Sequence, residues 1–389
     1  GQPFLSNAQD RNSTRLKYPK RISYYMSLQP LTLSAQSAQQ EATYRQGRLS
    51  NGLTYYIRHN AAEPGLAGFY LAQRVGSILE MPHQRGLAHF LEHMAFNGST
   101  HFRGEGASPG LISWCESVGI KFGTNLNACT GVDRTVYHIS SAPVRRQGVV
   151  DSCLLILRDW CDGLLLKEKA IDKERCVVRE EWRTRRTGMA VARMMEDAFP
   201  VIFKGSKYED AMPIGHLDVI NNFSPDALRD YYNKWYRPDL QAVVIVGDVD
   251  VNVIESQIKR LFGGLSLPPN APRRRYYPVA DNKRMITHVM RDAEQPIALA
   301  HLYMKRDVKP TSVRSSERYQ QEIYEHDLIC LMLNERLSKQ QSGAKAPFTA
   351  ASVKDGKFLI VQTKKAFSLS VSCKSDQIEA GLSAAVGLL

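Results

Sequence analysis

The amino-acid sequence predicts an α+β protein of two similar domains, each a mixed, mostly antiparallel sheet with helices packed on one face. Three observations lead to this prediction. The chain has 389 residues, more than one ordinary hydrophobic core holds. Short alternating patterns typical of strands occur between longer segments with a helical repeat. A stretch rich in proline and arginine near residues 266–283 separates two such series.

Changes in composition along the chain predict the domain boundaries. Residues 1–44 are polar and lack periodicity, so we expect a mobile N-terminal tail. A first domain is expected over 45–268, followed by a linker over 269–284. A second domain is expected over 285–389, where a helical pattern reaches the last residue without a stop signal. We therefore expect the second domain to be truncated and the chain to be part of a longer protein.

The pattern of apolar and turn residues predicts the individual elements. In the first domain, strands are expected at 53–58, 68–72, within 125–137 and at 243–246. Helices are expected there at 86–97, 109–118, 147–166, 169–186, 224–236 and 251–262. In the second domain, strands are expected at 285–290, 297–304, 357–363 and 367–373, with helices at 316–340 and from 376 onward.

The most informative segment reads His-Phe-Leu-Glu-His and spans His89 to His93 within the first expected helix. His89 and His93 are four residues apart, so both imidazoles leave the same helical face, which Glu92 shares. Two imidazoles can bind one divalent ion, while a carboxylate beside them serves as general base for a water molecule. The order H-x-x-E-H is that of the inverted zinc proteases. We therefore expect one Zn²⁺ per chain, with Glu92 as the catalytic base.

A hydrolytic zinc site needs a third protein ligand and one open position. Glu174 and Glu181 are seven residues apart, which is two helical turns, so they share a helical face. Glu180 points about a quarter turn away. We choose Glu181 as the third ligand and Glu174 as an auxiliary carboxylate in the catalytic site. On spacing alone, an ordinary charged helix surface remains an equal alternative.

These segments resemble the pitrilysin-type zinc metallopeptidases, the family of insulin-degrading enzyme and mitochondrial processing peptidase. Five segments match in the family's order: Gly86–Gly98, Asn127–Tyr137, Glu174–Glu181, Trp235–Pro238 and Val246–Asp248. The resemblance covers about 47–264 closely and 285–389 only in general pattern. It is greatest to the N-terminal half of the bacterial two-half members, and it implies the processing-peptidase-like metallohydrolase fold. It also implies that Glu181 is the third zinc ligand.

The resemblance implies a zinc-dependent endopeptidase that hydrolyses peptides or unfolded polypeptide segments. It further implies that one strand pairs with the substrate backbone. The residues of that strand are Leu126, Asn127, Ala128, Cys129 and Thr130. Asn127 is implied to contact a substrate carbonyl, and a turn or strand-end role with local hydrogen bonds is the alternative.

Active family members close two halves around a chamber. The resemblance therefore implies a C-terminal half or a partner subunit that completes the chamber, and we expect residues 1–389 alone to have weak peptidase activity. One alternative is a non-catalytic or incomplete family member that acts as a partner or scaffold subunit. Another is a structural metal site on a binding protein. The full set of metal and base residues favours the enzyme, and three evident ligands instead of four disfavour a structural site.

Composition limits the remaining function classes. The net charge is +12, but the basic residues are dispersed, so we expect no nucleic acid partner and at most a preference for acidic partners or peptides. No apolar stretch approaches the length of a membrane span. The seven cysteines include no CxxC pair, which disfavours a thiolate zinc site. The compartment stays unknown, with a bacterial source and an exported, periplasmic location favoured over the cytoplasm.

Overall fold

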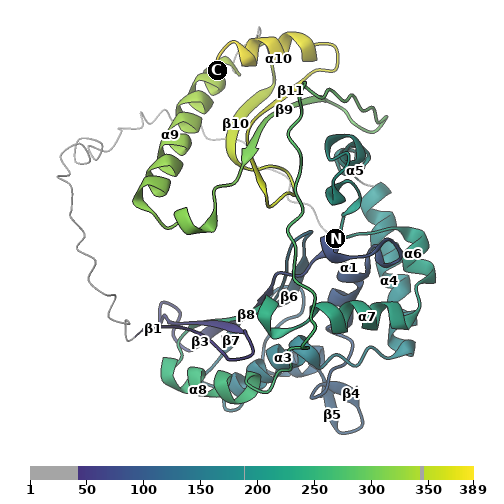
Figure 1. Cartoon of the computed structure of the whole chain (residues 1–389), viewed down its shortest axis with the longest axis vertical. Coiled ribbons are helices and arrows are strands. Elements are labelled where there is room, and N and C mark those ends of the chain that lie inside the picture. The colour runs from purple at the N-terminus through teal and green to yellow at the C-terminus, as the bar shows by residue number, and fades with distance from the viewer. Residues whose placement is uncertain (1–42, 188, 342–345) are drawn as a thin grey trace, which may run out of the picture. The chain divides into compact units, whose positions relative to one another are not determined.

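The structure is a computed structural model that describes residues 43–187, 189–341 and 346–389 (Figure 1). The tail expected over 1–44 lies almost entirely outside the described residues. Its last residue, Tyr44, already belongs to the first strand. The fold class is the predicted one, because mixed sheets and helices alternate along the chain.

A six-stranded sheet forms the centre of the first region, which we define as residues 44–262. Its strands are β1 (Tyr44–Arg48), β2 (Thr54–His59), β3 (Leu66–Gln73), β6 (Leu126–Thr130), β7 (Thr135–Pro143) and β8 (Gln241–Gly247). They lie in the order β1-β2-β8-β3-β7-β6. Strands β2 and β8 pair in parallel and the other neighbours are antiparallel. The sheet is therefore mixed and mostly antiparallel, and β6 lies at one edge.

Alternation of side chains explains why these segments form strands. In β3, Phe69 and Leu71 are fully buried while their neighbours are only partly covered, and in β8 the same holds for Val243 and Ile245. This period of two directs one face of each strand into the core. A small separate hairpin, β4 (Arg103–Glu105) with β5 (Ser108–Gly110), stands outside the main sheet.

Eight helices of the first region follow the strands in sequence. They are α1 (Leu87–Met94), α2 (Leu111–Ser117), α3 (Val149–Asp162), α4 (Glu168–Thr187), α5 (Ala190–Ile202), α6 (Leu217–Asn222), α7 (Pro225–Trp235) and α8 (Val251–Phe262). Short 3-10 turns are η2 (Ser77–Leu79), η3 (Pro82–Gln84), η4 (Lys207–Asp210), η5 (Pro238–Leu240) and η6 (Thr311–Val313). Helices α3 and α8 contact the sheet, while α1 contacts α4, α7 and the edge strand β6 (Figure 1). The motif helix is thereby held between the edge strand and α4.

All six helices expected in the first region are present, and two were missed. Helix α5 contains Pro200 and has no capping side chain at its start, so its sequence lacks the usual start signal and carries a helix breaker. Helix α6 has only six residues, too few for a periodic pattern. The missed helices are those whose sequence carries weak local signals.

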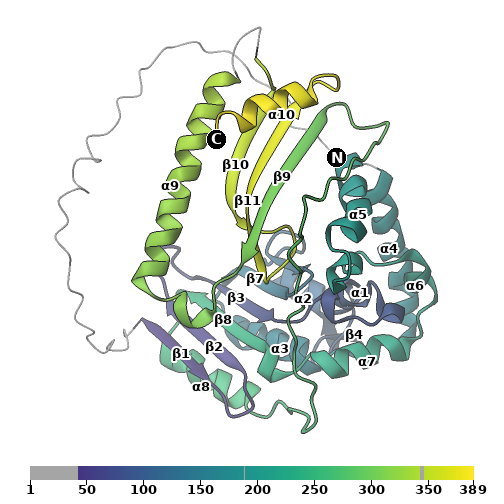
Figure 2. The same ribbon diagram turned by 45° about the horizontal axis from the view of Figure 1, so that its top comes forward.

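The second region, which we define as residues 298–386, has a three-stranded antiparallel sheet in the order β10-β11-β9. Its strands are β9 (Ala298–Asp307), β10 (Ala350–Lys357) and β11 (Lys364–Cys373), and its helices are α9 (Glu317–Gln340) and α10 (Ile378–Val386). Helix α9 packs against β10, and α10 packs against β11 and β9 (Figure 2). Residues 265–297 contain no helix or strand. The domain boundaries expected around 269–284 remain predictions.

Two strand predictions in the second region were wrong. Residues 285–290 form no strand, and Met285 and Val289 are 78% and 76% exposed. Residues 358–363 form the connection between β10 and β11 and are not a strand. The apolar residues that suggested a strand there are Phe358 and Val361. As part of this connection they are buried in the same hydrophobic core as the six-stranded sheet. An apolar run thus marked burial without marking strand conformation.

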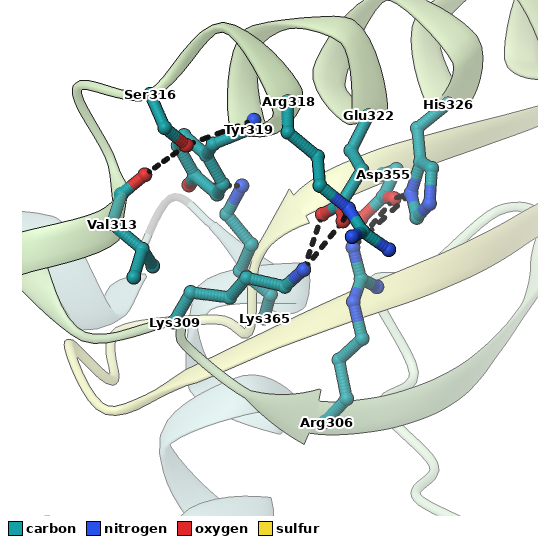
Figure 3. A network of polar contacts seen from close by, with 10 residues as sticks. All are labelled: Arg306, Lys309, Val313, Ser316, Arg318, Tyr319, Glu322, His326, Asp355 and Lys365. Carbon is teal, nitrogen blue, oxygen red and sulfur yellow. Dashed lines mark hydrogen bonds and ion pairs between the residues drawn. The ribbon is translucent and has the colours of Figure 1, made fainter.

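Charged side chains join α9 to the second sheet (Figure 3). Arg306 Nη2 donates to both carboxylate oxygens of Asp355, at 2.8 and 2.7 Å. His326 Nδ1 contacts the same carboxylate. Lys309 Nζ donates to Glu322 Oε1 at 2.6 Å. We call these five residues the α9 network.

No helix in the described parts of the chain combines the length and hydropathy that a membrane crossing requires.

Candidate metal centre

Helix α1 is fixed at its start by a buried carboxylate. It follows Gly86, whose φ of 104° lies in the left-handed region that glycine favours. Glu80 accepts hydrogen bonds from the backbone N–H groups of Gly86, at 3.1 Å, and Ala88, at 2.7 Å. Burial raises the pKa of Glu80 to about 8, although the two backbone hydrogen bonds oppose this. Glu80 therefore replaces the missing N-cap side chain of the helix that carries the zinc motif.

The three predicted metal ligands lie together in the structure. One potential ligand atom from each of His89, His93 and Glu181 lies within 4.8 Å of the others. Glu181 Oε2 is 3.5 Å from His89 Nε2 and 3.3 Å from His93 Nε2. Two atoms that bind one tetrahedral zinc ion at about 2.0–2.2 Å are themselves roughly 3.3–3.5 Å apart. The donor types and these separations therefore fit one zinc ion.

A second carboxylate, that of Glu174, contacts His93 at the ring nitrogen that does not face Glu181. Its Nδ1 atom lies 2.8 Å from Glu174 Oε1. Asn97 Nδ2 donates to Glu174 Oε2 at 3.0 Å and to the His93 carbonyl oxygen at 3.0 Å. Burial alone lowers the pKa of His93, but hydrogen bonds with Glu174 and Glu181 outweigh it and raise this pKa to about 9. Such a contact fixes the orientation of a metal-binding imidazole.

His89 has a different environment. Its ring lies 4.8 Å from the ring of His93, with an angle of 84° between the two planes. Its Nδ1 atom is buried and has no hydrogen-bond partner among the described residues. Burial lowers the pKa of His89 to about 4, and the charge of His93 adds to this shift. The ring is therefore neutral at pH 7, the state that metal binding requires.

The predicted base lies against the edge strand. The hydroxyl group of Thr130, the last residue of β6, donates a hydrogen bond to Glu92 Oε2. Burial raises the pKa of Glu92 above its ordinary value, and this hydrogen bond partly offsets the shift. Thr130 was predicted only as part of the substrate strand, and the structure brings it into contact with Glu92.

The predicted substrate strand is the edge strand β6. Leu126 is buried, whereas Asn127 and Cys129 are exposed. Asn127 makes local contacts in the structure: its Oδ1 accepts from the Ala128 N–H at 2.8 Å, and its Nδ2 donates to the Gly123 carbonyl at 3.4 Å. These are the contacts of the alternative interpretation. Substrate pairing along this edge remains a prediction.

Two functional candidates were missed in the sequence, Glu80 and Asn97. A carboxylate shortly before a helix that lacks a Ser, Thr or Asp cap is a usable signal for Glu80. Asn97 carried a helix-end signal, which concealed its contact with Glu174. Both contacts depend on burial and on chain segments that meet only in the fold.

Comparisons with known proteins identify the family. The family model described as Insulinase (Peptidase family M16) matches residues 67–199, and the model described as Peptidase M16 inactive domain matches residues 222–384. The chain belongs to the M16 family of insulinase-type peptidases. The first matched segment of this M16 chain contains the two histidines, Glu92, Glu174 and Glu181. The family predicted from the sequence is confirmed.

Relatives of this M16 chain carry the name of zinc proteases. It is 31% identical to the "Zinc protease PQQL-like" protein of Arabidopsis thaliana over 308 residues, which are 79% of this chain and 31% of the relative. It is 30% identical to the "Probable zinc protease PqqL" of Escherichia coli strain K12 over 318 residues, or 81% of this chain and 33% of the relative. The chain thus spans about a third of the length of these relatives.

One solved structure extends the similarity to the fold. The crystal structure of the first half of the periplasmic protease PqqL from Escherichia coli matches with a TM-score of 0.77 and 26% identity. The match covers 90% of this chain and 72% of that chain. The predicted α+β fold class is therefore confirmed for nearly the whole chain.

Proposed function

We propose that this M16-family chain is a zinc-dependent endopeptidase that hydrolyses peptides or unfolded polypeptide segments. The proposal depends most on one observation: Glu181 Oε2 faces the Nε2 atoms of His89 and His93 at 3.5 and 3.3 Å. These three residues would hold one zinc ion per chain. The zinc protease names of the relatives support the same activity.

The chemistry follows from the residues around this point. Zinc, when bound, supplies a Lewis acid that acidifies a water molecule and polarises a carbonyl oxygen. Glu92 precedes His93 directly on α1, and we assign it the transfer of a proton from water to the leaving amine. The Thr130 hydroxyl fixes one oxygen of this base. Glu174 and Asn97 fix the ring of His93, which limits the positions open to a metal ion.

Substrate binding is proposed at the edge of the sheet. An extended peptide can add a strand to β6 because β6 pairs with β7 on one side only. A strand that binds through its backbone recognises an extended shape more than a sequence. This fits peptides and unfolded segments and disfavours compact folded proteins.

The setting of the enzyme is proposed from the relatives. One matched structure is titled the first half of a periplasmic protease. By analogy we propose that a C-terminal half or partner subunit completes a chamber, that this chain alone is weakly active, and that it works in the periplasm. Cell fractionation with an antibody against this chain tests the location, and recovery in the cytoplasmic fraction contradicts it.

The test of the function compares the wild-type chain with its Glu92→Gln variant. Zinc content is measured together with hydrolysis of an internally quenched, unstructured peptide. We expect one zinc ion in both proteins, slow hydrolysis by the wild type that a chelator stops, and a rate about 10²–10⁴-fold lower in the variant. Absence of zinc from the wild type, or equal rates in both proteins, contradicts the proposal.

A further inference from the structure

Helix α4 carries five arginines, and one of them differs from the rest in its contacts. Three are bonded to carboxylates or carbonyls and one to a thiol: Arg175, Arg183, Arg186 and Arg179. Arg185 has no hydrogen bond or ion pair with any described residue, and its side chain is exposed. Its guanidinium group is therefore available to a partner from solution.

Arg185 lies on the metal-facing side of α4. It follows Glu181 by four residues, so the two share a helical face and are about 6 Å apart along the helix axis. Arg183, which is only two residues from Glu181, leaves a different face and pairs with Glu180 at 3.2 Å. The spacing therefore directs Arg185, and not Arg183, toward the region of the metal centre.

The charge of Arg185 contributes to lowering the pKa values of two groups in the metal centre. A hydrogen bond with His93 is the main cause of the lowered pKa of Glu181, and the charge of Arg185 contributes. Burial is the main cause of the lowered pKa of His89, and the charge of Arg185 again contributes. Because His89 belongs to α1, this influence crosses from one helix to the other.

Nearby carboxylates do not neutralise Arg185 by direct contact. Glu196 of α5 also feels its charge, but the Glu196 carboxylate lies 3.1 Å from Arg186 Nη1 and is already paired. Glu181 faces the two histidines of the metal centre. An unpaired cation beside a proposed cleavage site thus has no partner within the described part of the chain.

We propose that Arg185 binds a carboxylate of the peptide substrate near the cleaved bond and so gives this enzyme a preference for acidic peptides. The carboxylate comes either from an Asp or Glu side chain or from the C-terminus of the peptide. A guanidinium group suits either source, since its planar N–H groups match the two oxygens of a carboxylate. The net charge of +12 favours approach of the same peptides. This inference rests on the proposed peptidase function.

The test measures binding with cleavage switched off. The full chain carrying Glu92→Gln, loaded with zinc, is titrated with fluorescent peptides, and anisotropy gives the dissociation constants. In one series a single Glu moves along a neutral peptide, with Gln at the same position as reference. In a second series the neutral peptide carries either a free or an amidated C-terminus. The first series reports a side-chain carboxylate and the second a terminal one.

We expect one series to show binding roughly three- to tenfold tighter for the acidic peptide, between the value of an exposed ion pair and that of a charge-assisted hydrogen bond. The added substitution Arg185→Ala brings the ratio to about one, and Arg185→Lys gives an intermediate ratio. Arg183→Ala is the matched control, because it removes an equal charge two residues away and keeps the preference.

Equal dissociation constants in both series overturn the inference while leaving the peptidase proposal intact. A preference that persists in Arg185→Ala, or that Arg183→Ala removes equally, also overturns it. Absence of zinc-dependent binding to every peptide contradicts the proposed function, and this inference fails with it. Circular dichroism of each variant checks that folding is unchanged.

Discussion

Two clusters in this molecule share a histidine–carboxylate contact and differ in the cation that accompanies it. In the metal centre, His93 Nδ1 lies 2.8 Å from Glu174. In the α9 network, His326 Nδ1 contacts Asp355. There Arg306 donates to both oxygens of Asp355, at 2.8 and 2.7 Å, so the carboxylate is already neutralised (Figure 3).

The metal centre has no such paired lysine or arginine among the described residues. Among the described residues, no lysine or arginine forms an ion pair with Glu92, Glu174 or Glu181. Glu181 instead faces two imidazoles, one of which is neutral at pH 7. A partly buried carboxylate needs a compensating charge, which an arginine supplies in the α9 network. In the metal-free centre the protonated ring of His93 supplies it, and this proton is lost when a metal ion binds. The absence of a paired lysine or arginine, more than the presence of the histidine, therefore distinguishes the metal centre from the structural ion-pair cluster.

Substitution of the proposed carboxylate ligand is expected to weaken zinc binding most. Among the described residues, Glu181 is the one carboxylate that faces both imidazoles. Glu181→Gln therefore lowers zinc affinity by far more than the hundredfold typical of outer-sphere partners. Asp355→Asn makes the same chemical change in the α9 network and leaves zinc affinity unaltered. Competition with a fluorescent zinc chelator measures both. Equal affinities of Glu181→Gln and wild type contradict the ligand assignment.

A second, smaller effect concerns the residue behind His93. Glu174→Gln keeps the shape of the side chain but weakens the contact that orients the imidazole, so zinc affinity falls about 10- to 100-fold. The same competition assay, run above pH 9 so that no proton on His93 competes with zinc, measures this, with Glu322→Gln in the α9 network as control. Wild-type affinity in Glu174→Gln shows that this contact does not orient the ligand.

The two histidines of the metal centre should contribute differently to the pH dependence of zinc binding. In the metal-free protein the pKa of His93 is raised to about 9, so zinc must displace a proton from this ring below pH 9. Zinc affinity should therefore rise about tenfold per pH unit from pH 7 to 9 and then level off. His89, with a pKa of about 4, adds nothing in this range. In Glu174→Gln the levelling occurs at lower pH, and a flat profile in the wild type contradicts the assignment.

The smallest effect concerns stability. Glu80→Ala leaves the first backbone N–H groups of α1 buried without an acceptor, which costs about 1–3 kcal/mol of unfolding free energy. Glu322→Ala, which removes a partly exposed ion pair of the α9 network, costs less, because solvent screens such pairs. Denaturant unfolding measures both. Equal losses in the two variants contradict the capping role of Glu80.

Local sequence signals predicted much of the fold. Helices α7 and α8 directly follow Ser224 and Asp250, whose side chains accept backbone hydrogen bonds as N-caps do. The strand expected at 357–363 failed because Phe358 and Val361 are apolar for packing of a connection, which no periodicity records. Elements with a period and a cap were therefore predictable, and connections buried by tertiary contacts were not.

The same division applies to the site. His89, Glu92 and His93 lie close together in the sequence of α1, and their spacing alone predicts that they share one face of this helix. Glu181 needed a second helix to pack beside the first, which spacing did not determine and the family resemblance supplied. Glu80 acts on backbone N–H groups, and its signal is its place before an uncapped helix, which neither composition nor periodicity records. Arg185 differs from the other arginines of α4 by lacking a partner among the described residues, which no sequence pattern records.

We propose that one cation binds the two imidazoles and Glu181 and that one of its coordination positions remains open to water. X-ray absorption at the zinc edge of the purified chain, combined with metal analysis, tests it most directly. We predict one zinc ion per chain with nitrogen and oxygen neighbours only, at about 2.0–2.2 Å, two of them from imidazole. A spectrum with sulfur neighbours, one with fewer than two imidazoles, or a chain that retains no zinc contradicts it.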